Sequence, residues 1–507
     1  MTGSHSTLAA PDPILEEVRG FYETHHDGIE RSRARHRYYY DYLARVLRVR
    51  VPEGQRVLDL GCGAGHLLAA LRPSVGVGVD VSAPAIREAT ARYGGERLRF
   101  LEGDASRPDV LARTGGPFDT ILLVNVVTHL TDVQATLEGL HAVSHARTRV
   151  LIYSYSRLWQ PLLRLAELLG MKYRQPPESW LPPEEIENML SLADFEVVRD
   201  DKHVVCPVHV PLLADLANRY LGRLPLLDQL SLVFGIIARP APVSQGGARP
   251  APVSQSEARP APVRAGAVRP TVSVVIPCRN EAGHIRPLVE SLPALAEGSE
   301  FLFVEGNSTD DTAAVIQQAV AENPGRPLRF LKQPGKGKGD AVRFGFAQAR
   351  GDVLLILDSD MGVAPADVPK FVEALARGKC EMVNGSRLVY PMEGRAMRFL
   401  NLLANKFFAI LFSWLLGQQV RDTLCGTKAL WREDYERIAA NRSYFGDFDP
   451  FGDFDLLFGA SRLNLRIVDL AVRYHERQYG ETNISRFRHG WLLLQMSGFA
   501  ARKLKCL

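Results

Sequence analysis

The sequence VLDLGCGAG, residues 57–65, decides the fold of the first half of the chain. An apolar run suited to a buried strand ends there in a turn with three alternate glycines, Gly61, Gly63 and Gly65. Glycine lets the backbone turn tightly and lets a ligand approach without meeting a Cβ atom. Dinucleotide-binding folds prefer a longer gap before the third glycine, which there packs a helix beside a pyrophosphate. The shorter spacing therefore indicates a nucleoside cofactor other than NAD.

Three further apolar runs follow this turn, with helical stretches between them. VGVGVD ends in Asp80, LRFLEGD ends in Asp104, and FDTILLVNVV begins at Phe118. Such runs suit parallel strands buried on both faces, and ligands bind beyond the carboxyl ends of strands in these sheets. A carboxylate at Asp80 can accept both hydroxyls of a ribose, and Asp104 can accept from an exocyclic adenine amine.

The second half of the chain repeats this alternation with other polar groups at the strand ends. Asp358 and Asp360 are two positions apart at a strand exit and can share one divalent metal through their oxygens. Such a metal takes up the charge that develops on a nucleoside diphosphate leaving group. The basic, glycine-rich loop at 335–346, which includes Lys338, suits phosphate. The apolar runs of this half are TVSVVIPC at 271–278, EFLFVEG at 300–306, VLLILDSD at 353–360 and CEMVNGS at 380–386.

A segment rich in proline and alanine separates the two halves. A ten-residue repeat beginning ARPAPV occurs three times from Ala238, with almost no large apolar residue to build a core. Proline fixes φ and removes amide donors, so a semi-rigid polyproline-II spacer is expected. The length of 507 residues predicts two or three domains. We predict a helical cap at 1–50, an α/β domain at 51–238, the spacer at 239–270 and a second α/β domain at 271–507.

Composition excludes several classes of protein. The net charge of +4 is too small for nucleic acid as the main partner. The six cysteines form no CxxC pair, so a disulfide scaffold and a zinc knuckle are not expected, and a reducing cytoplasm fits. The first residues lack a basic head and an apolar run, so no signal peptide is expected. The longest apolar stretch, 407–417, is too short for a spanning helix.

In this order and spacing, VLDLGCGAG, VGVDVS, LEGDAS and FDTILLVNVVTHL resemble the class I S-adenosylmethionine-dependent methyltransferases over roughly residues 35–240. The resemblance implies S-adenosyl-L-methionine as the cofactor. The alternative is a doubly wound fold that binds another nucleotide. The residues implied at the cofactor are Asp59, Gly61, Gly63 and Gly65, with Asp80 on the ribose and Asp104 and Ala105 at the adenine.

The chemistry of this half is less defined by its sequence. Methyl transfer is an in-line displacement, so positioning does most of the work, and a base is needed only for a poor nucleophile. His129 is the candidate base, and a packed or helix-start histidine is the alternative. The opening helix carries several tyrosines and histidines that form an aromatic lid or pack as ordinary helix residues. The sequence does not identify the methyl acceptor.

The second half resembles the inverting family 2 glycosyltransferases of the GT-A fold, and among them the polyprenyl-phosphate sugar synthases. Three motifs beyond the strand ends contribute: DTLCGTK at 422–428, FGDFDLL at 451–457 and RYHERQYGETNISRF at 473–487. The resemblance implies a GDP- or UDP-linked sugar donor and Mg²⁺ or Mn²⁺. The implied residues are Pro277, Asn280, Glu281 and Glu305 for base and ribose, Lys338 for phosphate, Asp358 and Asp360 for metal, and Arg477 and Arg486 for the diphosphate or an acceptor phosphate.

Three departures from the family pattern leave questions open. Gly306 stands where a second acid is usual, which leaves the base preference open. Gly362 stands where glutamine is frequent, so water can replace one metal ligand. Asp455 stands where glutamate is frequent. Asp453 is the first candidate for an acceptor-side base, with a helix-start cap as its alternative, and Asp455 is the second. A phosphate acceptor is a good nucleophile and needs no base.

These motifs together predict a two-domain enzyme whose sugar acceptor is a polyprenyl phosphate or another glycoconjugate. The apolar segment 397–417 and the amphipathic, basic-ended segment 489–505 indicate contact with a membrane surface. The expected location is the cytoplasm, or the inner face of its membrane. Packing of both segments on the core or in a dimer is the alternative. A soluble small-molecule acceptor and a non-catalytic role for one half stay open.

Overall fold

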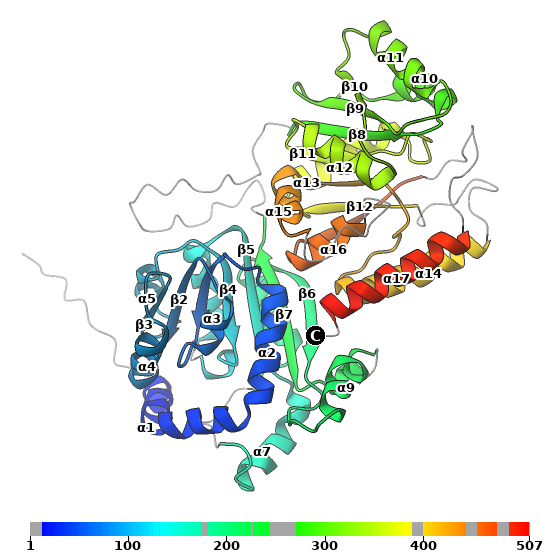
Figure 1. The fold of residues 1–507 in the computed structure, drawn as a ribbon. Helices are drawn as coiled ribbons and strands as arrows, with labels where there is room; N and C mark the ends of the chain where they lie inside the picture. Colours follow the sequence, from blue (N-terminus) through cyan, green and yellow to red (C-terminus); the bar gives the residue numbers. More distant parts are fainter. Residues whose placement is uncertain are drawn as a thin grey trace, which may run out of the picture. The chain divides into compact units, whose positions relative to one another are not determined.

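The computed structural model describes residues 13–130, 132–173, 180–224, 227–242, 270–387, 399–442, 454–473 and 486–505. These residues form two compact units, and each unit is built on one seven-stranded sheet. Figure 1 shows the strands of each sheet with the helices that pack against them. The predicted class, two doubly wound α/β domains, is confirmed.

The first sheet has the strand order β3-β2-β1-β4-β5-β7-β6. β1 to β4 run parallel to one another, as the buried apolar runs predict, and β5 pairs parallel with β4. β7 lies antiparallel between β5 and β6. The apolar runs of the sequence did not predict this change of strand direction. The strands are β1 (Arg56–Leu60), β2 (Val75–Asp80), β3 (Leu98–Glu102), β4 (Phe118–Val124), β5 (Ser144–Tyr155), β6 (Phe195–His203) and β7 (Val233–Pro240).

Helices connect these strands, and local sequence explains where two of them begin. Ser82 caps α4 by accepting from the amide of Ala85, with a proline in the first turn, and Asp132 caps α6 in the same way. The helices are α1 (Pro13–Arg35), α2 (Arg37–Arg50), α3 (His66–Ala70), α4 (Ala83–Tyr93), α5 (Pro108–Arg113), α6 (Val133–Gly139), α7 (Gln160–Leu168), α8 (Pro183–Leu192) and α9 (Leu213–Arg219).

The second helix is fixed to the sheet by packing and by a buried ion pair. Leu43 and Leu47 of α2 are fully buried in the core of this unit. Arg50, at the end of the same helix, donates through Nε to Asp201 Oδ2 at 2.6 Å and through Nη2 to Oδ1 at 2.9 Å. Both side chains are buried, and a buried charge without its partner is costly. This pair therefore holds α2 against β6.

The second sheet has the order β10-β9-β8-β11-β13-β12-β14. β8, β9 and β11 are parallel, as predicted, and β10 pairs parallel with β9, whereas β13 runs antiparallel to both β11 and β12. β12, at the run CEMVNGS, pairs parallel only with β14. The strands are β8 (Val272–Cys278), β9 (Glu300–Glu305), β10 (Leu328–Lys332), β11 (Val353–Ile356), β12 (Met382–Ser386), β13 (Lys428–Trp431) and β14 (Ile467–Ala471).

In the second unit, strands and helices also alternate along the chain as far as β13. Two consecutive helices follow β13 before the last strand and the last helix. The packing core contains the fully buried Phe303 of β9 and Phe371 of α13. The helices are α10 (Ala282–Ser291), α11 (Thr312–Glu322), α12 (Lys338–Gln348), α13 (Val368–Ala376), α14 (Phe399–Leu416), α15 (Arg432–Ala440), α16 (Phe454–Arg462) and α17 (Arg486–Leu504).

Two sequence predictions concern segments near the boundaries of these units. β7 continues to Pro240, two residues into the predicted spacer, and residues 243–269 of the spacer lie outside the described residues. Within the described ranges, no helix combines the length and the hydropathy that a bilayer-spanning segment requires.

Candidate functional site

Each sheet has one point at which the chain changes direction across the strand order. In the first sheet the chain runs from β1 through β2 to β3 and then returns to the other side of β1 with β4. In the second sheet β8, β9 and β10 are followed by a return to β11 beside β8. Ligands of open α/β sheets bind outside the carboxyl ends of the strands at such switch points. The predicted site residues that the structure describes lie in the last residues of these strands or in the turns that follow them, except Asp455 and Arg486, which lie in helices near the end of the second unit.

The glycine turn after β1 is tight, and one of its glycines faces open space. The φ angles of Gly61, Gly63 and Gly65 are 75°, 51° and 77°. Residues with a side chain rarely adopt such positive values. A Cβ atom on Gly61 would overlap Val126, and one on Gly65 would lie 2.7 Å from Phe100. On Gly63 the same atom would meet nothing within 4 Å. Gly63 is therefore the glycine of this turn that leaves room for a ligand.

Two neighbouring carboxylates stand behind this turn. Asp80 accepts from the amide of Gly63 at 2.8 Å and from the amide of Ser82 at 2.9 Å. Asp59 is only 2% exposed. Burial, and after it the charge of Asp80, raises the pKa of Asp59 to about 8. The buried carboxyl of Asp59 therefore keeps its proton to a higher pH than an ordinary aspartate does.

Two buried oxygens at adjacent strand ends lack hydrogen-bond partners among the described residues: Asp59 Oδ2 in β1 and Asn125 Oδ1 directly after β4. Asn125 has a φ of 53°, a conformation that non-glycine residues adopt uncommonly. Buried polar atoms are nearly always paired in folded proteins, with protein groups or with bound molecules. A ligand with donor groups or positive charge at this switch point would satisfy both oxygens.

Asp104 and Ala105 form the turn after β3. Asp104 Oδ1 accepts from the amide of Ser106 at 2.9 Å, and Oδ2 accepts from the Ser106 hydroxyl at 2.6 Å. Ala105 is buried. A carboxylate offers about four acceptor positions, so Asp104 can hold this turn and still accept from a ligand amine.

Two tyrosines of the opening helices reach the end of β4. The hydroxyl of Tyr22 in α1 lies 3.1 Å from His129 Nε2, and Tyr39 in α2 accepts from Asn125 Nδ2 at 3.3 Å. Burial raises the pKa of Tyr39 well above its ordinary value, so its hydroxyl stays protonated. The sequence left open whether these tyrosines form a lid or only pack. The contacts place two of them over the end of β4, beside the predicted base.

In the second unit the turns after β8 and β9 interlock. Asn280 has a φ of 57°, and its side-chain Oδ1 accepts from the backbone amide of Thr309 at 2.8 Å. The backbone amide of Asn280 donates to Ser308 Oγ at 3.1 Å. Glu305 Oε1 accepts from the amide of Ser308 at 2.5 Å. Gly306 donates its amide to the carbonyl of Cys278 at 2.8 Å. Asn280 and Glu305, two of the predicted base and ribose residues, therefore share one network.

Glu281 and Pro277 complete this edge of the sheet. Glu281 is buried, and its Oε2 lies 2.6 Å from Nδ1 of His284 in α10. The carbonyl of Pro277 accepts from Ser359 Oγ at 3.0 Å, which joins the ends of β8 and β11. Both residues stand where the sequence places them, at the switch point.

The charged centre of the second unit is an ion pair covered by a glycine. Lys338 Nζ, at the start of α12, lies 2.6 Å from Asp358 Oδ1, just beyond β11. A Cβ atom on Gly426 would overlap both Asp358 Oδ2 and Lys338 Nζ. Burial by itself would raise the pKa of Asp358, but Lys338 and then Lys428 and Arg387 hold it below its ordinary value. Asp358 is therefore a charged carboxylate in a positive environment.

The donor chemistry at this strand end fits a hard divalent cation. Asp360 Oδ1 accepts from the amide of Gly362 at 3.0 Å, which fixes the turn that follows Asp358. Mg²⁺ and Mn²⁺ prefer carboxylate oxygens and retain waters in their remaining positions. Asp358 and Asp360 would hold such a cation, with water where Gly362 offers no side-chain ligand.

The motif at 422–428 is anchored by its first residue. Asp422 is fully buried and accepts from Arg387 Nε at 2.8 Å, from Arg387 Nη2 at 3.0 Å and from Asn405 Nδ2 at 2.8 Å. Burial would raise the pKa of Asp422, but Arg387 outweighs this and lowers it. Asp422 therefore positions the backbone that carries Gly426 over the Lys338–Asp358 pair.

The candidate acceptor-side groups are described only in part. Asp455, in the first turn of α16, pairs with Arg442 Nε at 3.1 Å and is buried. Asp453 and Arg477 lie outside the described residues, and Arg486 begins α17 without a described side chain. The base and phosphate roles given to these residues stay predictions.

Sequence reasoning did not single out several residues of these sites. Gly426 belongs to a motif that the sequence displays, and its lack of a side chain is the signal that could have identified it. Arg387 is 35 positions from its partner Asp422, and no local pattern links the two. Asn125 follows a predicted strand at the switch point, where a polar residue was a detectable candidate.

Comparison with known proteins agrees with both units. Residues 32–200 match the family model of a methyltransferase domain, and residues 273–438 match that of glycosyl transferase family 2. The resemblances to a methyltransferase and to a family 2 glycosyltransferase are thereby confirmed. The chain is an enzyme that carries one transferase domain of each kind.

Two curated relatives illustrate the likeness. The low-salt glycan biosynthesis hexosyltransferase Agl6 of Haloferax volcanii is 28% identical over 44% of this chain and 52% of its own length. The dolichol-phosphate mannosyltransferase of Pyrococcus furiosus is 26% identical over 46% of this chain and 66% of its own length. The solved magnesium protoporphyrin IX methyltransferase of Synechocystis PCC 6803 is 16% identical, with a TM-score of 0.33, over 45% of this chain and 100% of its own. The chain thus spans about half of the first relative.

Proposed function

We propose that the chain is a bifunctional enzyme that transfers methyl groups from S-adenosyl-L-methionine and sugars from a nucleotide sugar. The sugar transfer is metal-dependent and inverting, and its acceptor is a polyprenyl phosphate or another glycoconjugate. The observation that carries this proposal is the pair of switch-point sites, one with an unpaired carboxyl oxygen and an unpaired amide oxygen, and one with a lysine–aspartate pair. We further propose that 1–50 and 51–238 form the methyltransferase, that 239–270 is a tether and that 271–507 form the sugar transferase.

The first site suits a cofactor that carries positive charge and a ribose. Asp59 Oδ2 and Asn125 Oδ1 offer acceptors to such a ligand, and the open face of Gly63 offers backbone contact. Bound S-adenosyl-L-methionine supplies the electrophilic methyl group. His129 takes the acceptor's proton when the acceptor is a hydroxyl, and Tyr22 orients His129 from 3.1 Å.

The second site suits an anionic leaving group. Lys338 supplies a positive charge at the start of α12, and Asp358 and Asp360 hold the divalent metal. A bound metal supplies charge neutralisation for the departing nucleoside diphosphate. Asn280, Glu281 and Glu305 would bind the base and ribose through their interlocked turns. A polyprenyl phosphate is itself a nucleophile, so neither Asp453 nor Asp455 needs to act as a base toward it.

Two neighbouring helices of the second unit support contact with a lipid surface. α14 and α17 pack against each other (Figure 1). Ile410 of α14 is 73% exposed, and Trp491 of α17 is 64% exposed. Arg502 and Lys503 lie in the last turn of α17, where basic residues favour anionic headgroups. We propose that this helix pair contacts the inner face of the cytoplasmic membrane, where a lipid-linked acceptor is located.

The direct test is transfer of labelled groups by the full chain. S-adenosyl-L-methionine with a labelled methyl group, and labelled GDP- and UDP-sugars with Mn²⁺ or Mg²⁺, are offered with vesicles that contain polyprenyl phosphate. We expect one nucleotide sugar to label the lipid, and we expect no labelling after metal chelation. Sugar transfer to soluble acceptors alone would overturn the lipid acceptor. Absence of sugar transfer together with absence of metal binding would instead support a non-catalytic binding or scaffolding role for this unit.

A further inference from the structure

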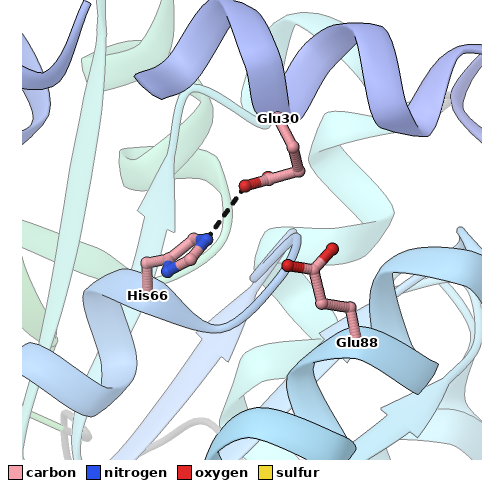
Figure 2. A group of neighbouring side chains, drawn as sticks. All are labelled: Glu30, His66 and Glu88. Carbon is pink, nitrogen blue, oxygen red and sulfur yellow. Dashed lines mark hydrogen bonds and ion pairs between the residues drawn. The ribbon is translucent and has the colours of Figure 1, made fainter. Parts of the chain in front are cut away.

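A histidine and two glutamates from three helices meet beside the glycine turn. His66 directly follows Gly65 and begins α3, Glu30 belongs to α1, and Glu88 belongs to α4. One ligand atom from each of the three lies within 4.8 Å of the others. Figure 2 shows both carboxylates directed toward the imidazole, with His66 Nε2 3.0 Å from Glu30 Oε2. None of the sequence motifs explains this group.

Each side of this group is oriented by a further polar contact. His66 Nδ1 lies 2.8 Å from the hydroxyl of Tyr93, which leaves Nε2 directed at the carboxylates. Glu88 Oε2 lies 2.7 Å from His26 Nε2. Histidines that bind metals nearly always use their second ring nitrogen in a hydrogen bond, and carboxylate ligands are likewise held by outer partners. Tyr93 and His26 occupy the positions of such outer partners.

The group opens onto solvent on one side. The three side chains are partly buried and line a hollow of about 760 Å³. Arg33 borders the same hollow, and Arg92 Nη1 lies 3.8 Å from Glu88 Oε1. These arginines offset part of the acidic charge, so a cation held by charge alone gains little here. A mixed imidazole and carboxylate set instead favours metals that bind nitrogen well, such as Zn²⁺, over Mg²⁺ or Ca²⁺.

We propose that Glu30, His66 and Glu88 bind one divalent transition-metal cation of the zinc class, with a fourth position open to the hollow. The cation links α1, the start of α3 after the glycine turn, and α4. Since α1 also carries Tyr22, metal binding holds the helix over the end of β4. The metal therefore acts on the first unit, and the proposal does not depend on which sugar or acceptor the second unit uses.

The test uses the full chain after chelation and dialysis, with Co²⁺ and Zn²⁺ as probes. A background variant, Asp358→Asn with Asp360→Asn, removes the carboxylates of the second unit that would also take a cation. We expect one Co²⁺ per chain with visible d–d absorption that Zn²⁺ displaces. In this background, His66→Gln lowers the affinity at least about 10-fold. The matched control is His145→Gln, because His145 also faces a carboxylate, Asp119 at 3.1 Å, outside the group.

Two results would overturn the proposal. One is the absence of Co²⁺ absorption in the background variant, and the other is equal Zn²⁺ affinity before and after His66→Gln. Either result reduces the group to an ion-paired contact between helices. If His66→Gln fails to fold, Glu30→Gln and Glu88→Gln provide the same comparison. Thermal unfolding adds a second readout, because Zn²⁺ raises the melting temperature of the parent and of His145→Gln but not of the cluster variants.

Discussion

The two sheets place their candidate sites at equivalent positions but surround them with different side chains, carboxyl groups in the first unit and basic groups in the second. In the first unit the switch point is bordered by the carboxyls of Asp59 and Asp80. In the second unit Asp358 is surrounded by Lys338, Lys428 and Arg387. As a result the pKa of Asp59 is raised by burial, whereas that of Asp358 is lowered despite burial. The topology determines where a ligand binds, and the side chains determine the charge of the ligand that suits the place.

This difference matches the ligands that we propose. A sulfonium cofactor carries positive charge and is attracted by acidic and unpaired oxygens. A nucleotide sugar carries a diphosphate and requires lysine and a metal. Changes in one site should therefore leave the ligand of the other site unaffected, and the first prediction below tests that independence.

The largest effect is expected for Asp358→Asn. Loss of the carboxylate removes a metal ligand and the partner of Lys338, so sugar transfer should fall at least about 1000-fold. Binding of S-adenosylhomocysteine should not change. Asp352→Asn, just before the same strand, is the matched control, since its carboxylate accepts from the amide and the hydroxyl of Thr271 and has no part in the site. A loss of S-adenosylhomocysteine affinity in Asp358→Asn would contradict the claim that the two sites bind their ligands independently.

The next effect is expected for Gly426→Ala. The added methyl group would overlap Asp358 and Lys338, so the pair must separate, and sugar transfer should fall by about 100-fold. Gly325→Ala is the control, because its Cβ atom meets nothing within 4 Å. Steady-state transfer rates of both variants measure the difference. Equal rates would show that Gly426 does not cover the reacting groups.

A third prediction compares two glycines of similar conformation in the first unit. Gly63 and Gly54 both have positive φ, 51° and 80°, and open space at the Cβ position. Alanine should therefore cost each about 1 kcal/mol of unfolding free energy. Only Gly63→Ala should weaken S-adenosylhomocysteine binding, by about 30-fold, because its Cβ atom enters the space left for the ligand. Equal affinity of both variants for the ligand would remove Gly63 from the site.

The smallest effect concerns the pH dependence of stability. Folded Asp59 keeps its proton up to about pH 8, whereas an unfolded aspartate loses it near its ordinary pKa. The unfolded state therefore binds fewer protons across this window, and stability falls as pH rises, by up to about 1.4 kcal/mol per pH unit. Asp59→Asn should remove this slope in denaturant unfolding between about pH 6 and pH 8.

Asp358→Asn is the control for this slope. The lowered pKa of Asp358 makes its contribution disappear only in acid, so its removal should leave the slope near neutral pH unchanged. If the unfolding free energy of Asp59→Asn falls with pH as steeply as that of the parent, the claim that the Asp59 carboxyl is protonated in the folded state is contradicted. The two aspartates thus test the opposite shifts directly.

The sequence allowed the parallel strands to be predicted because buried apolar runs ending in glycine or aspartate are local features. The antiparallel directions of β7 and β13 could not be predicted, since strand direction depends on distant connections rather than on the run itself. Lys338 and Asp358 were each predicted as site residues. Their contact was not predictable, because it depends on how α12 and β11 meet in space.

The cofactor residues show the same limit. The glycine spacing identified the turn after β1, but the overlap at Gly61 depends on Val126, which follows another strand, and the open space at Gly63 depends on the absence of such a neighbour. Likewise the group of Glu30, His66 and Glu88 joins three segments with no shared motif. Local patterns therefore revealed the strand ends, and only the packing revealed which side chains meet there.

The most direct test of the central claim is calorimetric titration of the intact chain with S-adenosylhomocysteine, GDP and UDP, each with and without Mn²⁺. The account predicts that S-adenosylhomocysteine binds regardless of Mn²⁺ and that one of the two nucleotides binds only when Mn²⁺ is present. Failure of either ligand to bind, or nucleotide binding that is indifferent to Mn²⁺, would contradict two sites of opposite charge preference.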